Sequence, residues 1–116
     1  MKKIYHLASC STCQRILKDV DAVNKQAELR DIKTEAISPA QLDEMKKLAG
    51  SYEALFSRKA LKYRSMGLHE QGLTEKDYRK LILEEYTFLK RPVAIVNKQI
   101  FVGNTKAVVE ALQKAL

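Results

Sequence analysis

Residues 3–13 read KIYHLASCSTC, and this stretch decides how the rest of the chain is interpreted. A short strand-like run leads to Cys10 and Cys13, the only cysteines of the chain. Apolar side chains then recur at helical spacing. At a helix start, free backbone N–H groups and the positive end of the helix dipole favour thiolate over thiol. The stretch therefore predicts a redox-active pair, with Cys10 exposed and Cys13 one helical turn further in.

Other interpretations of the cysteine pair stay open. Half of a zinc site would need further ligands, and the only histidines, His6 and His69, show no metal-binding spacing. A structural disulfide that closes so short a loop would restrain the unfolded chain little. Two unreactive cysteines in the core are a further alternative. Redox chemistry is favoured over these, and we expect no metal site.

Length and composition indicate one ordinary globular domain. The chain has 116 residues, of which 46% are hydrophobic and 30% charged. No apolar run approaches the roughly 20 residues of a membrane span. Met1–Lys3 leads directly into a strand and lacks the apolar core of a signal peptide. We therefore expect a monomeric protein of the cytoplasm without membrane attachment.

The formal net charge of +7 would suit an anionic substrate or partner, nucleic acid included. However, basic clusters such as Lys46-Lys47 and Lys90-Arg91 are interrupted by acidic and apolar residues. The chain has no basic tail and no known nucleic-acid motif. We interpret the charge as a solvated basic surface and expect no direct contact with nucleic acid.

The first third of the chain predicts a βαβ unit. Residues 3–7 are typical of a short strand, and Ser11 or Thr12 can cap the helix that follows. Residues 27–32 alternate like a half-buried strand. The expected helix presents its apolar residues at helical spacing: Cys13, Ile16, Leu17, Val20 and Val23.

The middle of the chain is expected to be helical. Ser38 with Gln41 forms a capping box, and a proline occupies the first helical position. Gly50 should end this helix, after which Ser51 can start a shorter one. Thr74 opens a further helix.

A hairpin and a terminal helix complete the pattern. Residues 93–96 and 99–102 are expected to be strands joined at Asn97-Lys98. Gly103-Asn104 should cap the last helix, with Val108, Ala111, Leu112 and Ala115 on one face. The order βαβ, helices, ββα predicts an α/β thioredoxin-like fold with a mixed four-stranded sheet. Residues 1–116 would form a single domain, with a core of about 1–37 and 87–116 and a helical insertion of about 38–86.

Three segments carry a resemblance to a known family. They are Ile4-Tyr5-His6 with Cys10 four residues after the histidine, the segment Leu55–Arg58, and the segment Leu89–Val93 before the hairpin. On these segments the chain resembles the arsenate reductase family in its glutaredoxin-like ArsC form, which also contains the Spx-type transcriptional regulators. The resemblance covers essentially the whole length and is more specific than Cys-x-x-Cys alone.

The resemblance implies roles for the residues around the cysteines. Cys10 matches the nucleophile, which attacks an oxyanion or a disulfide and is recycled by a thiol donor such as glutathione with glutaredoxin, or thioredoxin. Cys13 would be the resolving thiol. His6 matches a histidine that helps to ionise the nucleophile, although spacing alone would make it an ordinary strand residue.

The resemblance also implies an anion site. Arg58 and Arg91 match arginines that line it, and guanidinium forks suit tetrahedral oxyanions. Ser11 and Thr12 are assigned to the same site. Pro92 matches a proline that the family holds in cis opposite the cysteine loop. By residue type alone, either arginine would be a surface cation or the partner of an acid.

The chain departs from the family pattern at two places. The usual third arginine after the last strand is missing, and Lys106 is the nearest cation. The residue after Cys13, often arginine or lysine, is Gln14, and Arg15 follows it. The missing arginine weakens the case for arsenate.

Two functions follow from these observations. One is a thiol-dependent reductase that acts on an arsenate-like oxyanion or on a glutathione mixed disulfide and needs no bound cofactor. The alternative is an Spx-like redox-sensing transcriptional regulator, in which the Cys10 and Cys13 pair is a switch and the partner is the RNA polymerase α subunit. A redox-inert binding module is a third possibility.

Overall fold

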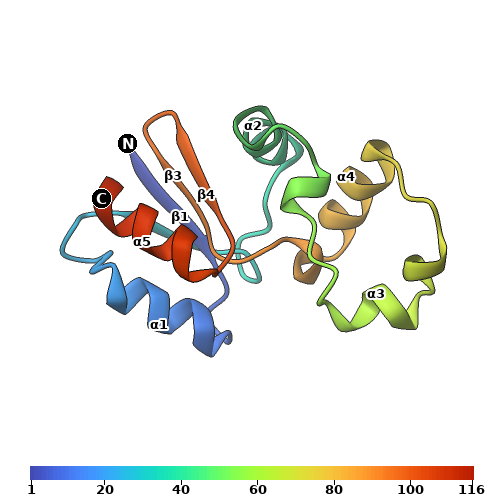
Figure 1. Cartoon of the computed structure of the whole chain (residues 1–116), viewed down its shortest axis with the longest axis horizontal. Helices are drawn as coiled ribbons and strands as arrows, with labels where there is room; N and C mark the ends of the chain where they lie inside the picture. The colour runs from blue at the N-terminus through green and yellow to red at the C-terminus, as the bar shows by residue number, and fades with distance from the viewer. The chain divides into compact units, whose positions relative to one another are not determined.

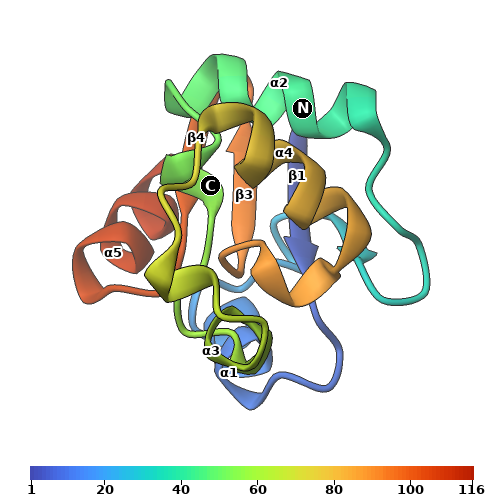
Figure 2. The same cartoon turned by 90° about the vertical axis from the view of Figure 1, so that its right-hand side faces the viewer.

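The computed structural model describes residues 1–116. The chain divides into two compact units, which are Met1–Ala36 with Arg91–Leu116, and Ile37–Lys90. Figures 1 and 2 label the α-helices and the strands β1, β3 and β4. None of the helices combines the length and the apolar character that crossing a bilayer requires.

The first unit is built on a mixed four-stranded sheet with the order β2-β1-β3-β4. Strand β1 pairs parallel to β2 and antiparallel to β3, which in turn pairs antiparallel to β4. The bounds are β1 Lys2–His6, β2 Glu28–Asp31, β3 Val93–Val96 and β4 Gln99–Val102. This confirms the expected α/β class and the mixed sheet.

Two helices cover one face of this sheet, α1 (Ser11–Asp19) and α5 (Lys106–Ala115), as Figure 1 shows. Ile4 and Ala94 are paired across β1 and β3, so their side chains project from the same face. Both pack in one apolar cluster with Ile16 of α1 and Leu112 of α5. This cluster fixes the start of α1 at the carboxyl end of β1.

The structure corrects the expected bounds of α1. The helix ends at Asp19, and the chain turns at Asp21, which has a positive φ of 57°. Val23 therefore lies beyond the helix, 74% exposed, and not on its buried face. At the other end, the N-cap residue is Cys10 and not Ser11 or Thr12, and no side chain caps this helix.

The terminal helix also starts later than expected. Thr105, not Gly103-Asn104, is its N-cap, and the Thr105 side chain accepts a hydrogen bond from the Val108 backbone N–H. Ala111 is exposed, whereas Val109 packs on the apolar cluster. The buried face is therefore rotated from the one that we expected.

The second unit is helical. Its elements are α2 (Pro39–Ala49), α3 (Leu61–Ser65), α4 (Glu75–Glu84) and 3-10 turns at Glu53–Leu55, Leu68–Glu70 and Tyr86–Phe88. Both predicted helix starts are confirmed, with capping boxes at Ser38 and Thr74. Gly50 ends α2 at a φ of +100°. An ion pair between Arg79 and Asp43 joins α4 to α2. Figure 2 labels these two helices.

The last residues of the second unit pair with its interior. Phe56 and Leu89 form an isolated antiparallel bridge, and the Lys90 backbone N–H donates to the Leu55 carbonyl at 2.8 Å. The Phe56 ring stacks on Phe88 with ring centroids 5.1 Å apart. These contacts tie residues 88–90 to the second unit, whose last residue is Lys90.

Candidate active site

The two cysteines lie where β1 passes into α1. The Cys10 backbone N–H donates to the Leu7 carbonyl at 3.0 Å, which closes the turn after the strand, and Cys10 then caps the helix. Cys10 is partly exposed, whereas Cys13 is fully buried at 0% exposure. A reagent in solution therefore meets the Cys10 sulfur first.

The surroundings of Cys10 favour its thiolate. Burial raises the pKa of Cys10, but the backbone N–H and the thiol of Cys13, the charge of Arg91 and the backbone N–H of Thr12 together lower this pKa below its ordinary value. The backbone donors are free because the first turn of a helix leaves its N–H groups without intrahelical partners. The thiolate thus has both hydrogen-bond donors and a cation.

Cys13 is shifted in the opposite direction. Burial, the hydrogen bond to Cys10 and the charge of Cys10 together raise the pKa of Cys13 to about 11. A backbone hydrogen bond from Leu7 and the charge of Arg91 act in the opposite direction but are outweighed. When the pair loses its first proton, the negative charge therefore forms on Cys10 and the remaining proton stays on Cys13.

Arg91 lies beside the cysteine loop because of the strand register. Tyr5 pairs with Val93, so the end of β1 and the start of β3 are neighbours. The Arg91–Pro92 peptide bond is cis, the isomer that the resemblance implies. The Nη1 atom of Arg91 is buried and has no hydrogen-bond partner. A buried donor without a partner is costly, and an anion is the natural group to pair with it.

His6 lies under the start of α1 and is only 9% exposed. The Gln14 side-chain nitrogen lies 3.4 Å from His6 Nδ1 and donates to the Leu7 carbonyl at 3.2 Å. Burial lowers the pKa of His6, and the charge of Asp31, its register partner on β2, offsets this in part. His6 is therefore neutral at pH 7, and its role in ionising Cys10 stays a prediction.

Gln14 is the site residue that sequence reasoning missed. In the sequence, Gln14 stands out only as a departure from the family pattern. The contact joins a strand end to a helix start across eight residues. One feature of the sequence could have indicated this contact: Gln14 lies in the first turn of the helix that follows the short loop after His6.

Arg58 belongs to the second unit, where acidic and aromatic groups hold its side chain. Its Nη2 lies 2.7 Å from Glu53 Oε2 and donates to the Tyr78 hydroxyl at 3.0 Å. The hydrogen bond to Glu53 raises the pKa of the guanidinium. The role of Arg58 in an anion site stays a prediction.

The first unit brings together His6, Cys10, Ser11, Thr12, Cys13, Arg91 and Pro92 at one end of β1 and β3. Ser11 is exposed and Thr12 partly exposed in the first turn of α1. The backbone N–H of Thr12 donates a hydrogen bond to Cys10 and lowers the pKa of its thiol. No cluster of three or more histidine, cysteine, aspartate or glutamate side chains is placed to hold a metal ion.

Comparison with solved structures shows the same fold. The arsenate reductase from Vibrio cholerae is 18% identical with a TM-score of 0.80, covering 99% of this chain and 97% of that one. An arsenate reductase related protein from Brucella melitensis is 23% identical with a TM-score of 0.74, covering 95% and 92%. SACOL0876 from Staphylococcus aureus is 24% identical with a TM-score of 0.77, covering 96% and 97%.

The family assignment rests on a match over almost the whole chain. No curated protein sequence matches it. The model of the ArsC family does match, over residues 5–112. This range includes both cysteines, Arg58, Arg91 and the complete sheet except for the first residues of β1. With its thioredoxin-like sheet and helix-capping cysteine, the chain belongs to the ArsC family.

Proposed function

We propose that this protein is a thiol-dependent oxidoreductase of the arsenate reductase type, with Cys10 as nucleophile and Cys13 as resolving thiol. The observation that carries the proposal is the opposite shift of the two thiols. The pKa of Cys10 is lowered, whereas burial raises that of Cys13 to about 11. A thiolate is the reactive form of cysteine, so the exposed sulfur is the activated one.

The proposed substrate is an arsenate-like oxyanion or a mixed disulfide with glutathione. The unpaired Nη1 of Arg91 supports an anion, since a guanidinium fork can meet two oxygens of one group. The participation of Arg58, Ser11 and Thr12 rests on the resemblance. His6 is proposed as a helper of Cys10 on the same ground.

With an oxyanion, the Cys10 thiolate attacks arsenic and an oxygen leaves as water after taking up protons. The Cys13 sulfur then attacks the Cys10 sulfur, and the sulfur–arsenic bond breaks with its electron pair left on arsenic. Arsenic is thereby reduced from As(V) to As(III), and the two sulfurs are oxidised to a disulfide. Two external thiols reduce this disulfide and form one of their own.

With a mixed disulfide, the Cys10 thiolate attacks one sulfur and releases the other as a thiolate. Cys13 displaces the bound glutathione and again closes a disulfide. Once Cys10 has formed a covalent bond, its negative charge no longer raises the pKa of Cys13. The resolving thiol therefore loses its proton more readily after the first step than before it.

The proposed electron donors are glutathione with glutaredoxin, or thioredoxin, and no bound cofactor is required. We place the protein in the cytoplasm, because thiols are kept reduced there. We further propose that it is a monomer.

The test is turnover of the purified chain with arsenate or a glutathionylated peptide, supplied with glutathione, glutaredoxin and NADPH-driven recycling. Cys10→Ser should abolish turnover. Cys13→Ser should leave a trapped adduct on Cys10 that mass spectrometry identifies as arsenic or glutathione. Turnover of the unchanged chain at background level with every donor, together with no adduct in Cys13→Ser, would overturn the proposal.

An Spx-like regulator is the second candidate, favoured by the paired cysteines and the missing third arginine. In that case oxidation to the disulfide is the signal and the RNA polymerase α subunit is the partner. Capture of purified α subunit by the oxidised chain but not by the reduced chain would support it.

A further inference from the structure

Arg91 is an arginine without an acidic partner. It takes part in none of the ion pairs of the chain, whereas Arg30, Arg58 and Arg79 are each paired with a carboxylate. The Nη1 atom of Arg91 is buried and has no hydrogen-bond partner. Because a buried donor without an acceptor is costly, this guanidinium favours the uptake of an anion from solution.

A second negative group uses the same cation. Tyr5 pairs with Val93, which brings Arg91, two residues before Val93, to the end of β1 and to the cysteine loop that follows it. Cys10 is partly exposed in this loop. The largest charge effect on Cys10 comes from Arg91 and favours the thiolate. Arg91 is therefore the counter-ion of the Cys10 sulfur as well as the arginine of the proposed anion site.

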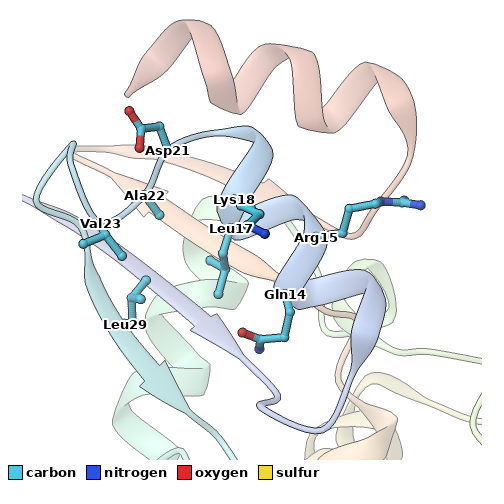
Figure 3. A pocket seen from close by; sticks show the side chains of 8 residues that line it. All are labelled: Gln14, Arg15, Leu17, Lys18, Asp21, Ala22, Val23 and Leu29. Carbon is cyan, nitrogen blue, oxygen red and sulfur yellow. The ribbon is translucent and has the colours of Figure 1, made fainter.

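Other cationic and titratable groups around α1 do not take over this role. Arg15 and Lys18 line a separate groove between α1 and β2 (Figure 3), and neither is among the groups with the largest effect on the pKa of Cys10. Burial lowers the pKa of His6, which is therefore neutral at pH 7. An incoming anion and the thiolate thus depend on the same guanidinium.

We propose that a tetrahedral oxyanion and the Cys10 thiolate compete for the guanidinium of Arg91. The site then binds an oxyanion more tightly when Cys10 is neutral, as the thiol or in the disulfide, than when it is the thiolate. Two negative charges beside one cation repel each other, whereas a neutral sulfur leaves the whole charge of the cation to the anion. This competition presupposes the proposed anion site at Arg91 and makes that site sensitive to the state of Cys10.

The coupling is reciprocal. If the thiolate weakens oxyanion binding about tenfold, a bound oxyanion raises the pKa of Cys10 by about one unit. It also stabilises the disulfide, because reduction by two glutathione thiols yields the Cys10 thiolate, the Cys13 thiol, glutathione disulfide and one proton. A tenfold shift of this equilibrium lowers the reduction potential by about 30 mV. Inorganic oxyanions would therefore hold the chain in its oxidised form.

Sulfate is the probe, because it stays doubly charged over the whole pH range of the experiment. The full chain, reduced with dithiothreitol, is titrated with sodium sulfate at constant ionic strength between about pH 5 and pH 9. Carbon-bound protons of Arg91 and Val93, which do not exchange with water, report binding in ¹H–¹³C NMR spectra. The same titration is carried out on the oxidised chain and on Cys10→Ser.

The pH course of the sulfate Kd separates the forms. In the reduced chain the Kd should rise about tenfold as the pH passes through the pKa of Cys10, which lies below 9.0. Cys10→Ser lacks the thiolate but retains His6 and Asp31, the titratable groups at the ends of β1 and β2. Its Kd should therefore not show this rise, and neither should that of the oxidised chain.

Alkylation of Cys10 measures the coupling from the other side. Saturating sulfate should move the midpoint of the alkylation curve up by about one pH unit, relative to sodium chloride of the same ionic strength. Arg91→Met should abolish both sulfate binding and this shift, and Arg91→Lys, which keeps the charge, should retain part of both. Lys90→Met removes a charge from the adjacent position and should leave both unchanged.

Three outcomes would overturn the competition. They are a sulfate Kd with the same pH course in the reduced chain and in Cys10→Ser, tighter binding of sulfate to the thiolate form, and no saturable binding to any form. None of these measurements uses turnover, so such a failure leaves the oxidoreductase proposal standing. A chain that shows the competition but reduces no substrate would lose the proposed function alone.

Discussion

The thiol of Cys13 donates a hydrogen bond to Cys10, and this bond lowers the pKa of the acceptor and raises that of the donor. One buried proton thus serves two purposes. It stabilises the negative charge on the outer sulfur, and it keeps the inner sulfur in its neutral thiol form.

Thiol modification should report this asymmetry directly. Cys10 should react with iodoacetamide along a pH curve whose midpoint lies below the 9.0 of an unperturbed cysteine. Cys13 should stay unmodified in the folded chain until the pH approaches about 11. Timed labelling followed by peptide mass spectrometry measures both. Equal labelling of the two cysteines at pH 7 would contradict the assignment.

The shift of Cys13 also affects stability. Because burial raises its pKa from 9.0 to about 11 in the folded chain, the stability that its neutral thiol contributes is fully present below pH 9 and is lost as the pH rises toward 11. We expect the free energy of unfolding in urea to fall over this interval. The fall should be smaller in Cys13→Ala, which removes the titrating group; identical pH profiles would argue against a shifted Cys13.

Arg91 should have two effects. Its positive charge should stabilise the Cys10 thiolate, and its two parallel N–H donors should bind an anionic substrate. Arg91→Met should raise the pKa of Cys10 and slow its alkylation at pH 7 by up to about tenfold, as loss of one neighbouring charge does. Arg91→Lys should retain much of the alkylation rate but raise the KM for an oxyanion, because lysine has no fork.

The matched control for Arg91 is Lys90→Met, which removes a charge from the adjacent position. Lys90→Met should leave both the alkylation rate of Cys10 and the KM for an oxyanion unchanged. If Lys90→Met and Arg91→Met slowed alkylation equally, the effect would come from net charge and not from contact with the sulfur.

His6 should be neutral and hydrogen-bonded to Gln14. With the Gln14 amide donating to Nδ1, the proton of the ring lies on Nε2, which ¹⁵N NMR of the imidazole distinguishes. Because burial lowers the pKa of His6, its contribution to stability is present above about pH 6.5 and is lost as the pH falls.

Gln14→Glu adds a carboxylate beside this ring and should raise the pKa of His6. Gln14→Met, of similar size, adds no charge and is the control. If a protonated His6 helps to ionise Cys10, Gln14→Glu should also speed alkylation of Cys10 below neutral pH; an unchanged rate would remove His6 from that role.

The cap of α4 should have a measurable effect on stability. The Thr74 side chain accepts from the Asp77 backbone N–H at 3.3 Å, and the Asp77 carboxylate accepts in return from the Thr74 backbone N–H at 2.9 Å. Thr74→Ala should lower the free energy of unfolding by about 1 kcal/mol. Thr34→Ala, in an exposed turn without a helix to cap, should change it little.

Features set by a few neighbouring residues could be predicted from the sequence. The capping box at Ser38, the helix start at Thr74 and the hairpin turn at Asn97 depend on side chains within four positions of one another. The end of α1 could not, since periodicity continued to Val23 while the chain turned at Asp21. Helix α3 was missed because none of its residues is buried, so no apolar pattern marks it.

The same distinction holds for the candidate site. The motif identified Cys10 and Cys13, because their positions follow from a local helix start. The raised pKa of Cys13 depends on burial, and the lowered pKa of Cys10 depends in part on Arg91, which is brought to the loop by the pairing of Tyr5 with Val93, 88 positions apart in the chain. The contact of Gln14 with His6 likewise depends on how α1 is oriented relative to β1, which the local sequence does not determine.

From the full burial of Cys13 we expect the following response of the chain to peroxide. An oxidant reaches the outer sulfur alone and converts it to a sulfenic acid, already in contact with a thiol. Condensation of the two releases water and forms a disulfide, which thiols can reverse. A second equivalent of oxidant would otherwise carry the outer sulfur to the sulfinic state, so the inner sulfur protects its neighbour from irreversible damage.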